Sequence, residues 1–340
     1  MLTSQTGAPL AKRRFGNTDL EVSRLAVGGW LGIRFDPNAD PAAPPRLDDA
    51  HITGQEAAIA AVAPAVELGI NYFDTAPMYH AGLAETLLGI GLKALPPPIR
   101  RTVYVSTKVG QPPERPAQYD RDSVLWSFER SLKRLHTDQI DIVYIHDPLR
   151  DDHMTQILSP GAALDTLHEL KAQGLIKAIG LGVRNHRFLQ QAVESGRFDA
   201  ILPSYDYTPI RDSAAAVMRL AAQRNMAVVN GSPYCAGLLA GINLDLAARK
   251  RPADSTHDVE YARRLLHWAK TQAVDLGAVA MQYSMRNPDI TVTLAGPRDV
   301  AEVESNVRHA TTPLPAGIWD ALDDFLRTTR RPPQKARPVP

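Results

Sequence analysis

The chain alternates between short apolar runs and longer segments whose apolar residues recur every three or four positions. The short runs are rich in β-branched and aromatic residues, as is typical of buried strands. They lie at 24–28, 71–74, 103–107, 140–145, 176–183, 200–203, 227–230 and 290–294. The longer segments predict amphipathic helices at 55–68, 123–135, 162–173, 187–195, 213–224, 259–276 and 300–309. Pro64 falls inside the first of these helices and predicts a kink there.

The regular alternation of strand and helix predicts an α/β fold with a parallel sheet, because parallel neighbours need a crossover connection. Eight units favour a (β/α)8 TIM barrel, although periodicity alone leaves an open doubly wound sheet as an alternative. Residues 13–22, with Gly16-Asn17 at their centre, predict an N-terminal β-hairpin, and 36–54 predict a long rim loop. We expect three parts: an N-terminal extension, a single barrel domain and a flexible Pro-rich tail, at 1–12, 13–329 and 330–340.

Charge and composition narrow the function classes. The 340 residues include 38 Lys and Arg and 37 Asp and Glu, so the net charge of +1 predicts no attraction to nucleic acid or to a membrane surface. No apolar run approaches the roughly 20 residues of a membrane span, and the N-terminus lacks the apolar core of a secretory signal. The single Cys235 excludes an internal disulfide. These features favour a cytoplasmic protein with a small-molecule substrate; the oligomeric state is unknown at this point.

Three successive strand candidates end in ionisable residues: Asp74, Lys108 and His146, and Tyr79 follows five residues after Asp74. Function in a barrel gathers at the C-terminal ends of the strands, so we expect these side chains to meet. A lysine cation favours the phenolate of a neighbouring tyrosine, and a carboxylate can hold that lysine. A histidine can orient a substrate oxygen. The set suits proton transfer coupled to hydride transfer at a carbonyl or hydroxyl carbon.

Each residue alone also has a structural reading, as a helix cap, a core aromatic or a satisfied polar pair. It is their joint occurrence at neighbouring strand ends that favours catalysis. A metal-dependent hydrolase using His146 and Asp147 is the alternative from another class. It would need further His or carboxylate ligands at the later strand ends, which the sequence does not supply, so we expect no metal.

The segment GINYFDTAPMY, from Gly69 to Tyr79, resembles the Gly-x-x-x-x-Asp-Thr-Ala-x-x-Tyr signature of the aldo-keto reductase family. Lys108 and His146 match the other two members of that family's catalytic tetrad. The resemblance implies a barrel that binds an extended nicotinamide dinucleotide without a Rossmann domain. It also implies roles: Tyr79 as general acid and base, Lys108 and Asp74 as the groups that tune it, and His146 as the group that orients the substrate.

The same resemblance implies a cofactor site formed by the end of the first strand, at Gly29, and by segments in the C-terminal half of the chain. Its expected residues are Gly29, Asn185, Ser232, Tyr234, Ala236, Arg298, Glu302 and Asn306. Glu302 aligns with a position where NADP-dependent members often carry Arg. A carboxylate there would repel a 2′-phosphate and favours NAD over NADP, with Arg298 arguing partly the other way.

The substrate side departs from the family pattern. Trp30 and Arg184 are the expected substrate contacts, and Arg184 replaces the Ser that the family carries before Asn185. The tyrosine that stacks on nicotinamide in the family aligns with Gly231 here. Tyr205 and Tyr234 are therefore the aromatic candidates for that role.

The segments IHDP, GLGVRN and VVNGSPYCAGLLAG resemble the sugar and pyridoxal dehydrogenase branch of the family. That likeness implies NAD(P)-dependent oxidation of a cyclic hemiacetal, such as L-fucose or L-galactose, at C1 to the lactone. Three alternatives stay open: oxidation of pyridoxal to pyridoxolactone, general NADPH-dependent reduction of aldehydes and ketones, and a non-enzymatic redox-sensing regulatory subunit.

Overall fold

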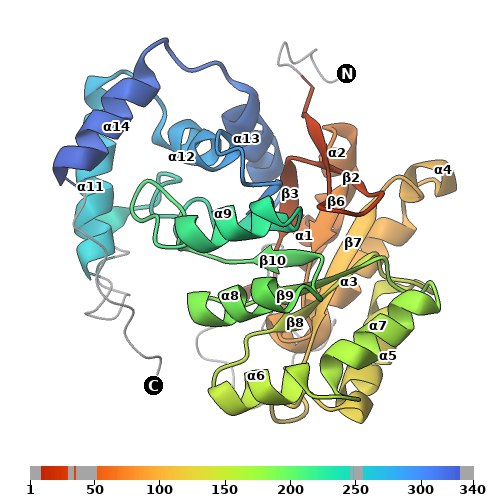
Figure 1. Ribbon diagram of the computed structural model, residues 1–340. Coiled ribbons are helices and arrows are strands. Elements are labelled where there is room, and N and C mark those ends of the chain that lie inside the picture. Colours follow the sequence, from red (N-terminus) through yellow and green to blue (C-terminus); the bar gives the residue numbers. More distant parts are fainter. Residues whose placement is uncertain (1–8, 30–33, 36–51, 246–247, 249–255, 330–340) are drawn as a thin grey trace.

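The computed structural model describes residues 9–29, 34–35, 52–245, 248 and 256–329. Eight parallel strands close into a barrel in the order β10-β11-β12-β3-β6-β7-β8-β9 (Figure 1). Their bounds are β3 (Leu25–Gly28), β6 (Tyr72–Asp74), β7 (Tyr104–Val109), β8 (Ile142–His146), β9 (Ala178–Gly182), β10 (Ala200–Leu202), β11 (Ala227–Gly231) and β12 (Val292–Ala295). The (β/α)8 prediction is confirmed, and the open-sheet alternative is wrong, because the last strand pairs with the first, Thr293 opposite Leu25.

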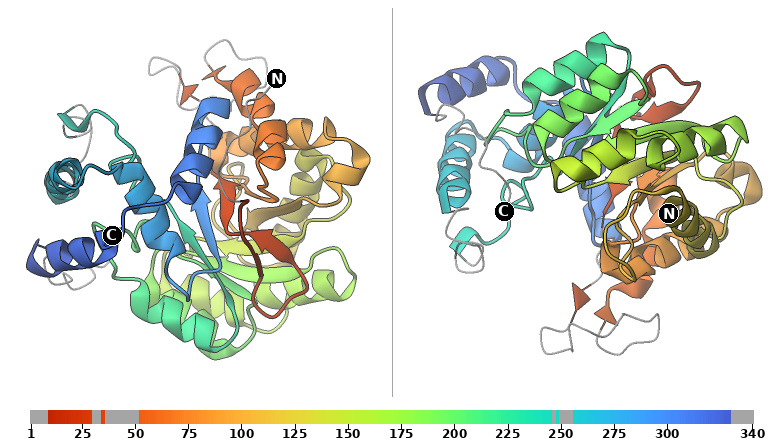
Figure 2. Two further views of the ribbon diagram at one scale, coloured as in Figure 1. Left: turned by 90° about the horizontal axis from the view of Figure 1, so that it is seen from above. Right: turned by 60° about the horizontal axis from the view of Figure 1, so that its bottom comes forward.

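Helices surround the barrel on all sides, and α11 and α14 lie together beyond α12 (Figure 2). Among the described residues, no helix is both long and apolar enough to cross a membrane. The helix bounds are α1 (Gln55–Ala60), α2 (Val62–Glu67), α3 (Leu83–Lys93), α4 (Pro97–Arg100), α5 (Arg121–Leu135), α6 (Asp151–Leu158), α7 (Ala163–Ala172), α8 (His186–Ser195), α9 (Ala215–Gln223), α11 (Thr256–Thr271), α12 (Leu276–Met285), α13 (Val300–Thr311) and α14 (Ile318–Thr329), with a 3₁₀ turn η1 at Tyr79–Gly82.

Two predicted helices differ from the structure in their bounds. The helix expected at 55–68 breaks at Ala61, between α1 and α2, because Pro64 has no N–H to donate to the preceding turn. The helix expected at 259–276 is wrong at its end: α11 stops at Thr271, and Asp275 caps a new helix, its side chain accepting from the Ala278 N–H. Helices α3, α4, α6 and α14 have no counterpart among the predicted ones, and the predicted helix at 259–276 reaches only the first residue of α12.

The predicted N-terminal hairpin is confirmed as β1 (Lys12–Arg14) and β2 (Glu21–Ser23), with Lys12 opposite Ser23. Gly16 turns the chain with φ of 56°, and a Cβ there would lie 2.6 Å from the Ala227 backbone nitrogen, so this tight approach requires glycine. The hairpin side chain Phe15 is buried, and its ring meets that of Tyr72 edge-on at 6.0 Å.

Most of the predicted rim loop at 36–54 lies outside the described residues, as do 1–8 and the predicted tail at 330–340. The described pieces that flank this segment are two short antiparallel strands, β4 (Arg34–Phe35) and β5 (Ile52–Thr53). The end of the predicted loop is therefore a strand.

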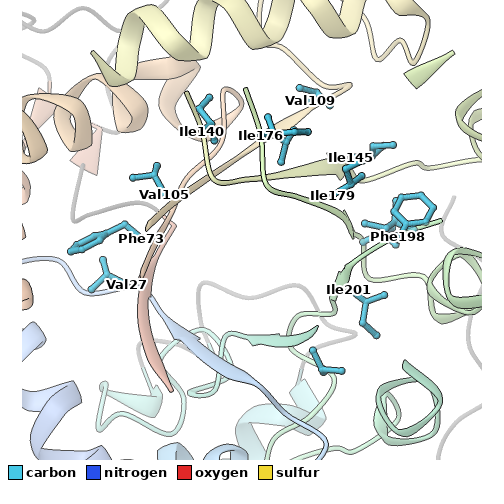
Figure 3. Packing of buried hydrophobic residues seen from close by; sticks show 14 of the residues in the cluster. Val27, Phe73, Val105, Val109, Ile140, Ile145, Ile176, Ile179, Phe198 and Ile201 are labelled. Carbon is cyan, nitrogen blue, oxygen red and sulfur yellow. The ribbon is translucent and has the colours of Figure 1, made fainter. Parts of the chain in front are cut away.

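Alternation along the barrel strands separates an apolar outer layer from a mixed interior. Outward-facing residues such as Phe73, Val105 and Ile179 pack into the main apolar cluster beneath the helices (Figure 3). Their neighbours point inward, because successive side chains on a strand face opposite sides. Tyr72 and Tyr144 belong to the interior cluster. The C-terminal ends of β6, β7 and β8 thus bring inward-facing side chains to one rim.

Candidate active site

The structure brings together the four residues expected to form the catalytic set. The Lys108 ammonium donates to Asp74 Oδ2 at 2.6 Å and to the Thr75 carbonyl at 2.7 Å, and both charged side chains are almost completely buried. It lies 4.7 Å from the centre of the Tyr79 ring. The His146 ring meets Tyr79 edge-on with 5.9 Å between centroids. A cation, a phenol and an imidazole therefore share one small volume at the rim.

A tight backbone turn holds Tyr79 over this lysine. The Tyr79 N–H donates to the Ala76 carbonyl at 3.0 Å, and the next two residues, His80 and Ala81, adopt left-handed φ angles of 50° and 52°. Left-handed φ angles strain the backbone of non-glycine residues, and such strain is often found beside functional side chains. Gly82, with φ of 89°, then starts α3. The phenol is thus fixed by backbone geometry.

The electrostatics of Tyr79 and Lys108 are set by burial and by each other. Burial raises the pKa of Tyr79, and the Lys108 cation offsets part of that rise. Burial alone would lower the pKa of Lys108, but Asp74 and Tyr79 outweigh it and raise this pKa. Lys108 is therefore a permanent cation. As predicted, Lys108 lowers the pKa of Tyr79, but burial raises this pKa by more. The phenol therefore stays protonated at neutral pH.

His146 is a neutral imidazole. Burial, with a further contribution from Lys108, holds the pKa of His146 well below its ordinary value. Its Nε2 lies 3.5 Å from Oδ2 of Asp147, and its backbone carbonyl accepts from the Tyr119 hydroxyl at 2.8 Å. The other ring nitrogen, Nδ1, is buried and has no hydrogen-bond partner among the described residues. An unsatisfied buried nitrogen of this kind is expected where a ligand binds.

A hydroxyl layer that sequence reasoning missed lies directly beneath these groups. Asp74 Oδ1 accepts from Ser106 at 2.6 Å, and Ser106 accepts from the Tyr72 hydroxyl at 3.0 Å. The Tyr72 and Tyr144 hydroxyls lie 3.1 Å apart. The signal in the sequence was a hydroxyl residue two positions before each strand-end residue, which strand periodicity places on the same inward face.

Two of the expected cofactor residues, Gly29 and Asn185, lie on the barrel rim and leave room for a ligand. Gly29 has φ of 84°, and no atom of the described residues lies within 4 Å of a Cβ built on it. Asn185 caps α8 by accepting from the Arg187 N–H at 3.0 Å, so its NH2 group is the part that can donate to a ligand. These features fit a flat, polar group such as a nicotinamide carboxamide, which needs close backbone approach and a hydrogen-bond donor.

The loop after β11 has the left-handed backbone of an anion-binding loop. Ser232 and Ala236 have φ of 60° and 54°, with Cys235 between them at 50°. Successive N–H groups in such turns form concavities that suit phosphate oxygens. The Ser232 N–H itself donates to the Leu294 carbonyl at 3.1 Å, which ties the loop to β12. The left-handed backbone of this loop is therefore the feature that would suit a pyrophosphate.

Tyr234 joins this loop to α13. Its hydroxyl donates to Oδ1 of Asn306 at 2.9 Å and lies 2.8 Å from Nδ1 of His309. Tyr234 and Asn306, two of the expected cofactor residues, are therefore hydrogen-bonded to each other. Tyr205, the second aromatic candidate for stacking, lies under the Arg184 guanidinium at 5.6 Å.

The start of α13 carries two carboxylates. Asp299 caps the helix by accepting from the Glu302 N–H at 2.9 Å. Glu302 in turn accepts from the Arg298 backbone N–H at 2.7 Å and pairs with the Arg298 guanidinium. Glu302, which favours NAD, and Arg298, which favours NADP, are therefore paired with each other. The charge of the arginine is balanced by this carboxylate.

The expected substrate residues have different outcomes. Trp30 lies outside the described residues. Arg184 is half exposed and its guanidinium contacts the buried Asp206 carboxylate at 2.9 Å, alongside His186 at 3.1 Å. Burial alone would raise the pKa of Asp206, but the hydrogen bonds from His186 and Arg184 outweigh it and lower this pKa. Arg184 is therefore anchored at the rim by a partner that sequence reasoning did not identify.

No group of three or more metal-ligating side chains occurs within the described ranges.

The model of the aldo/keto reductase family matches residues 49–327 of the chain. L-galactose dehydrogenase of Arabidopsis thaliana is 32% identical over 304 residues, which cover 88% of each chain. D-threo-aldose 1-dehydrogenase of a Pseudomonas species is 30% identical, covering 75% of this chain and 84% of that protein. Pyridoxal 4-dehydrogenase of Microbacterium luteolum is also 30% identical, covering 92% and 96%.

The fold agrees with these sequence relatives. A solved aldo-keto reductase of Bacillus halodurans, in its holo form, superposes with a TM-score of 0.69 at 22% identity, covering 93% of this chain and 96% of that one. The predicted family resemblance is thereby confirmed: the chain belongs to the aldo/keto reductase family and is an NAD(P)-dependent oxidoreductase.

Proposed function

We propose that this enzyme oxidises a cyclic hemiacetal, an aldose such as L-galactose or L-fucose, at C1 to the lactone. The observation that carries the proposal is the placement of the Tyr79 phenol against the Lys108 cation and the neutral His146 imidazole. The relatives named for L-galactose, D-threo-aldose and pyridoxal support it, because each of these substrates has a cyclic hemiacetal form.

In the proposed mechanism, His146 hydrogen-bonds the oxygen on C1 and directs its hydroxyl toward Tyr79. Tyr79 accepts the hydroxyl proton as the C1–H bond breaks and the C1–O bond becomes a carbonyl. Lys108, fixed by Asp74 at 2.6 Å, stabilises the Tyr79 phenolate that accepts this proton. A bound nicotinamide dinucleotide supplies the hydride acceptor. Gly29, Asn185 and the loop containing Ser232 and Ala236 are the groups proposed to hold it.

A carboxylate beside His146 favours a hydroxylated substrate. Asp147 Oδ2 lies 3.5 Å from His146 Nε2, and the Asp147 side chain is 41% exposed. Two hydrogen bonds fix the Asp147 backbone. Its N–H donates to the Gly182 carbonyl, and its carbonyl accepts from the Gln111 side-chain amide. A carboxylate that is held rigidly and is still accessible accepts strong hydrogen bonds from sugar hydroxyls.

NAD is the proposed cofactor in preference to NADP. Asp299 and Glu302 place two carboxylates at the start of α13, where an arginine would be needed to balance a 2′-phosphate. The Arg298 guanidinium is already paired with Glu302. Adding a doubly charged phosphate there would separate this pair or bring like charges together, and both are costly.

Pyridoxal is the second candidate substrate. The relative named pyridoxal 4-dehydrogenase aligns over more of this chain than the two sugar dehydrogenases do, 92% against 88% and 75%. The proposed chemistry is unchanged, because pyridoxal would react through its internal hemiacetal. The pyridine ring would then replace the sugar hydroxyls near Asp147.

A substrate panel tests the proposal. Purified protein is assayed with L-fucose, L-galactose and pyridoxal as reductants of NAD+ or NADP+, and with simple aldehydes as oxidants of NADH or NADPH. We expect NAD+ reduction by one of the hemiacetals to be the fastest reaction. Dominant reduction of simple aldehydes with NADPH would overturn the dehydrogenase assignment.

The variant Tyr79→Phe tests the mechanism. It should abolish turnover while leaving cofactor affinity, measured by fluorescence titration, unchanged within about twofold, because only the proton acceptor is lost. The loss of turnover would also exclude a generic hydride transfer that needs no phenol. A Tyr79→Phe protein with wild-type turnover would contradict the proposed role, and cofactor binding without turnover on any substrate in the wild type would instead favour the regulatory-subunit alternative.

A further inference from the structure

We propose that Ser106, Tyr72 and Tyr144 are positioning residues for the reaction, forming a directed hydrogen-bond chain that holds Asp74 and, through Lys108, sets the proton affinity of Tyr79. The inference rests on the proposed role of Tyr79 and adds a second layer beneath the catalytic one. It assigns a function to three buried hydroxyl groups that the proton and hydride transfers themselves do not use.

The barrel builds this second layer through strand periodicity. Tyr72, Ser106 and Tyr144 stand two residues before Asp74, Lys108 and His146 on β6, β7 and β8. In the sheet register Asp74 pairs with Ser106, and Lys108 pairs with Tyr144. Residues two apart on a strand share a face, so each hydroxyl lies one layer deeper in the barrel than an ionisable side chain.

The donors and acceptors of this hydrogen-bond chain can be arranged in one direction only. The Asp74 carboxylate can only accept, so Ser106 must donate its single proton to Oδ1. Ser106 is then free to accept, and the Tyr72 hydroxyl donates to it. With its proton used, Tyr72 can only accept from Tyr144 in the remaining contact at 3.1 Å. All three protons therefore point toward Asp74, and the dipoles add along the chain.

Burial makes each of these bonds consequential. All three side chains are fully buried, so a broken link leaves a polar atom without water to replace its partner. Burial raises the pKa of Tyr72 and of Tyr144 far above the ordinary value of a phenol, which keeps both as donors. The fold also makes room for the last member: a Cβ at Gly180 would lie 2.2 Å from the Tyr144 ring.

The chain acts on Tyr79 through a single point of contact. Among the described residues, the charged groups that act on Tyr79 include Lys108, Asp74 and Asp147, and the His146 ring lies at the edge of the Tyr79 ring. Asp74 is the one that the hydroxyls touch. At the deeper end, Asp141 acts on Tyr72 from the start of β8. A change in the chain therefore reaches Tyr79 by way of the Asp74–Lys108 pair.

The sign of the effect follows from charge sharing. A donor on Oδ1 disperses the negative charge of Asp74, which leaves more of the Lys108 field to stabilise the Tyr79 phenolate. Without that donor the carboxylate charge is concentrated on Oδ2, against Lys108, and cancels more of its field. Removing the Ser106 hydroxyl should therefore make Tyr79 harder to deprotonate.

The experiment compares Ser106→Ala, Tyr72→Phe and Tyr144→Phe with wild type. Tyr79 is titrated by its phenolate absorbance in the protein without cofactor, with Tyr79→Phe as the spectral blank, and the pH profile of hemiacetal oxidation is measured. For Ser106→Ala we expect the pKa of Tyr79 to rise by about one unit and kcat at neutral pH to fall about tenfold, with KM for the cofactor changed less than about twofold. The shift should decrease from Ser106→Ala to Tyr72→Phe to Tyr144→Phe.

Two controls separate this role from simple barrel packing. Ser106→Thr keeps the donor and should keep the wild-type profile. Thr293→Val removes a buried hydroxyl elsewhere in the barrel wall, one that contacts Ser284 at 2.7 Å, and should leave the Tyr79 titration unchanged. Equal shifts in Thr293→Val and Ser106→Ala, or no shift in Ser106→Ala and Tyr72→Phe, would overturn the inference.

The test distinguishes this inference from the proposed function. If Tyr79→Phe abolishes turnover while the Ser106 and Tyr72 variants titrate as wild type, only the hydroxyl chain is refuted. If Tyr79→Phe stays active, the proposed mechanism fails first. The phenolate titration still reports on the chain in that case, because it needs neither cofactor nor substrate.

Discussion

The Lys108 ammonium lies 4.7 Å from the centre of the Tyr79 ring while it is hydrogen-bonded to Asp74 at 2.6 Å. The cation is therefore shared between a full negative charge and a neutral phenol. Burial raises the pKa of Tyr79 more than this shared cation lowers it. The protein thus holds its proposed acid and base as a phenol that releases its proton only in alkaline solution.

The first prediction concerns the direction of the reaction and its pH dependence. Oxidation needs the phenolate of Tyr79, whose pKa lies above the ordinary value of about 10, so kcat for oxidation should rise continuously from neutral to alkaline pH. Reduction needs the phenol, so its rate should be independent of pH until the same alkaline range and fall there. His146 adds no step near neutrality, because its pKa is lowered. Initial rates in both directions test this, and an oxidation rate that falls above neutral pH would contradict it.

The second prediction concerns the choice of cofactor. Glu302→Gln removes a carboxylate at the start of α13 and frees Arg298 from its ion pair. The ratio of kcat/KM for NADP+ to that for NAD+ should rise about tenfold, mainly through KM for NADP+. Glu304→Gln makes the same charge change two residues along α13 and should leave the ratio unchanged. Equal effects of the two variants would show that only net charge matters.

The third prediction uses two glycines of β9 that differ in the space beside them. A Cβ at Gly180 would lie 2.2 Å from the Tyr144 ring, whereas one at Gly182 would have its nearest contact at 3.7 Å. Gly180→Ala should therefore lower the free energy of unfolding by about 1–3 kcal/mol through overpacking, and Gly182→Ala by clearly less. Urea unfolding measures both. Equal losses would mean that Tyr144 moves aside without cost.

The fourth prediction concerns substrate recognition by Asp147. Asp147→Asn keeps the shape of the side chain and removes the charge that would accept sugar hydroxyls. We expect kcat/KM for the aldose to fall about tenfold, and that for a simple aldehyde without hydroxyl groups to change less than about twofold. Asp152→Asn is the control, since it removes a nearby exposed carboxylate that pairs with Arg150. A uniform loss on all substrates would place Asp147 in support of His146 instead.

Sequence reasoning predicted the parts of this molecule that depend on local pattern. The eight barrel strands follow from short apolar runs, and Asp74, Lys108 and His146 are found together because parallel strands end at one rim. The helix boundaries near Ala61 and Leu276 were harder to predict, since the missing N–H of Pro64 and the capping side chain of Asp275 decide them. Ion-pair partners from distant segments could not be predicted, because nothing near Arg184 in the sequence indicates its contact with Asp206.

The last prediction concerns a buried ion pair behind the active-site strands. Glu85 on α3 is fully buried, and it accepts from Arg134 on α5 at 3.0 Å and from Thr107 at 2.5 Å. Burial raises the pKa of Glu85, and these partners offset part of the rise. Removing the arginine leaves a buried carboxyl group with too few donors, which is more costly than losing an exposed pair.

Arg134→Met should therefore lower the free energy of unfolding by about 3 kcal/mol at neutral pH, measured by urea denaturation. Arg130→Met is the matched control, because it breaks a pair with Glu114 whose side chains are 43% and 35% exposed, and it should cost less than about 1 kcal/mol. Adding Glu85→Met to Arg134→Met should restore most of the loss, because no buried charge is then left without a partner. If the double variant is less stable than Arg134→Met alone, Glu85 stabilises α3 through Thr107 and the ion pair is secondary.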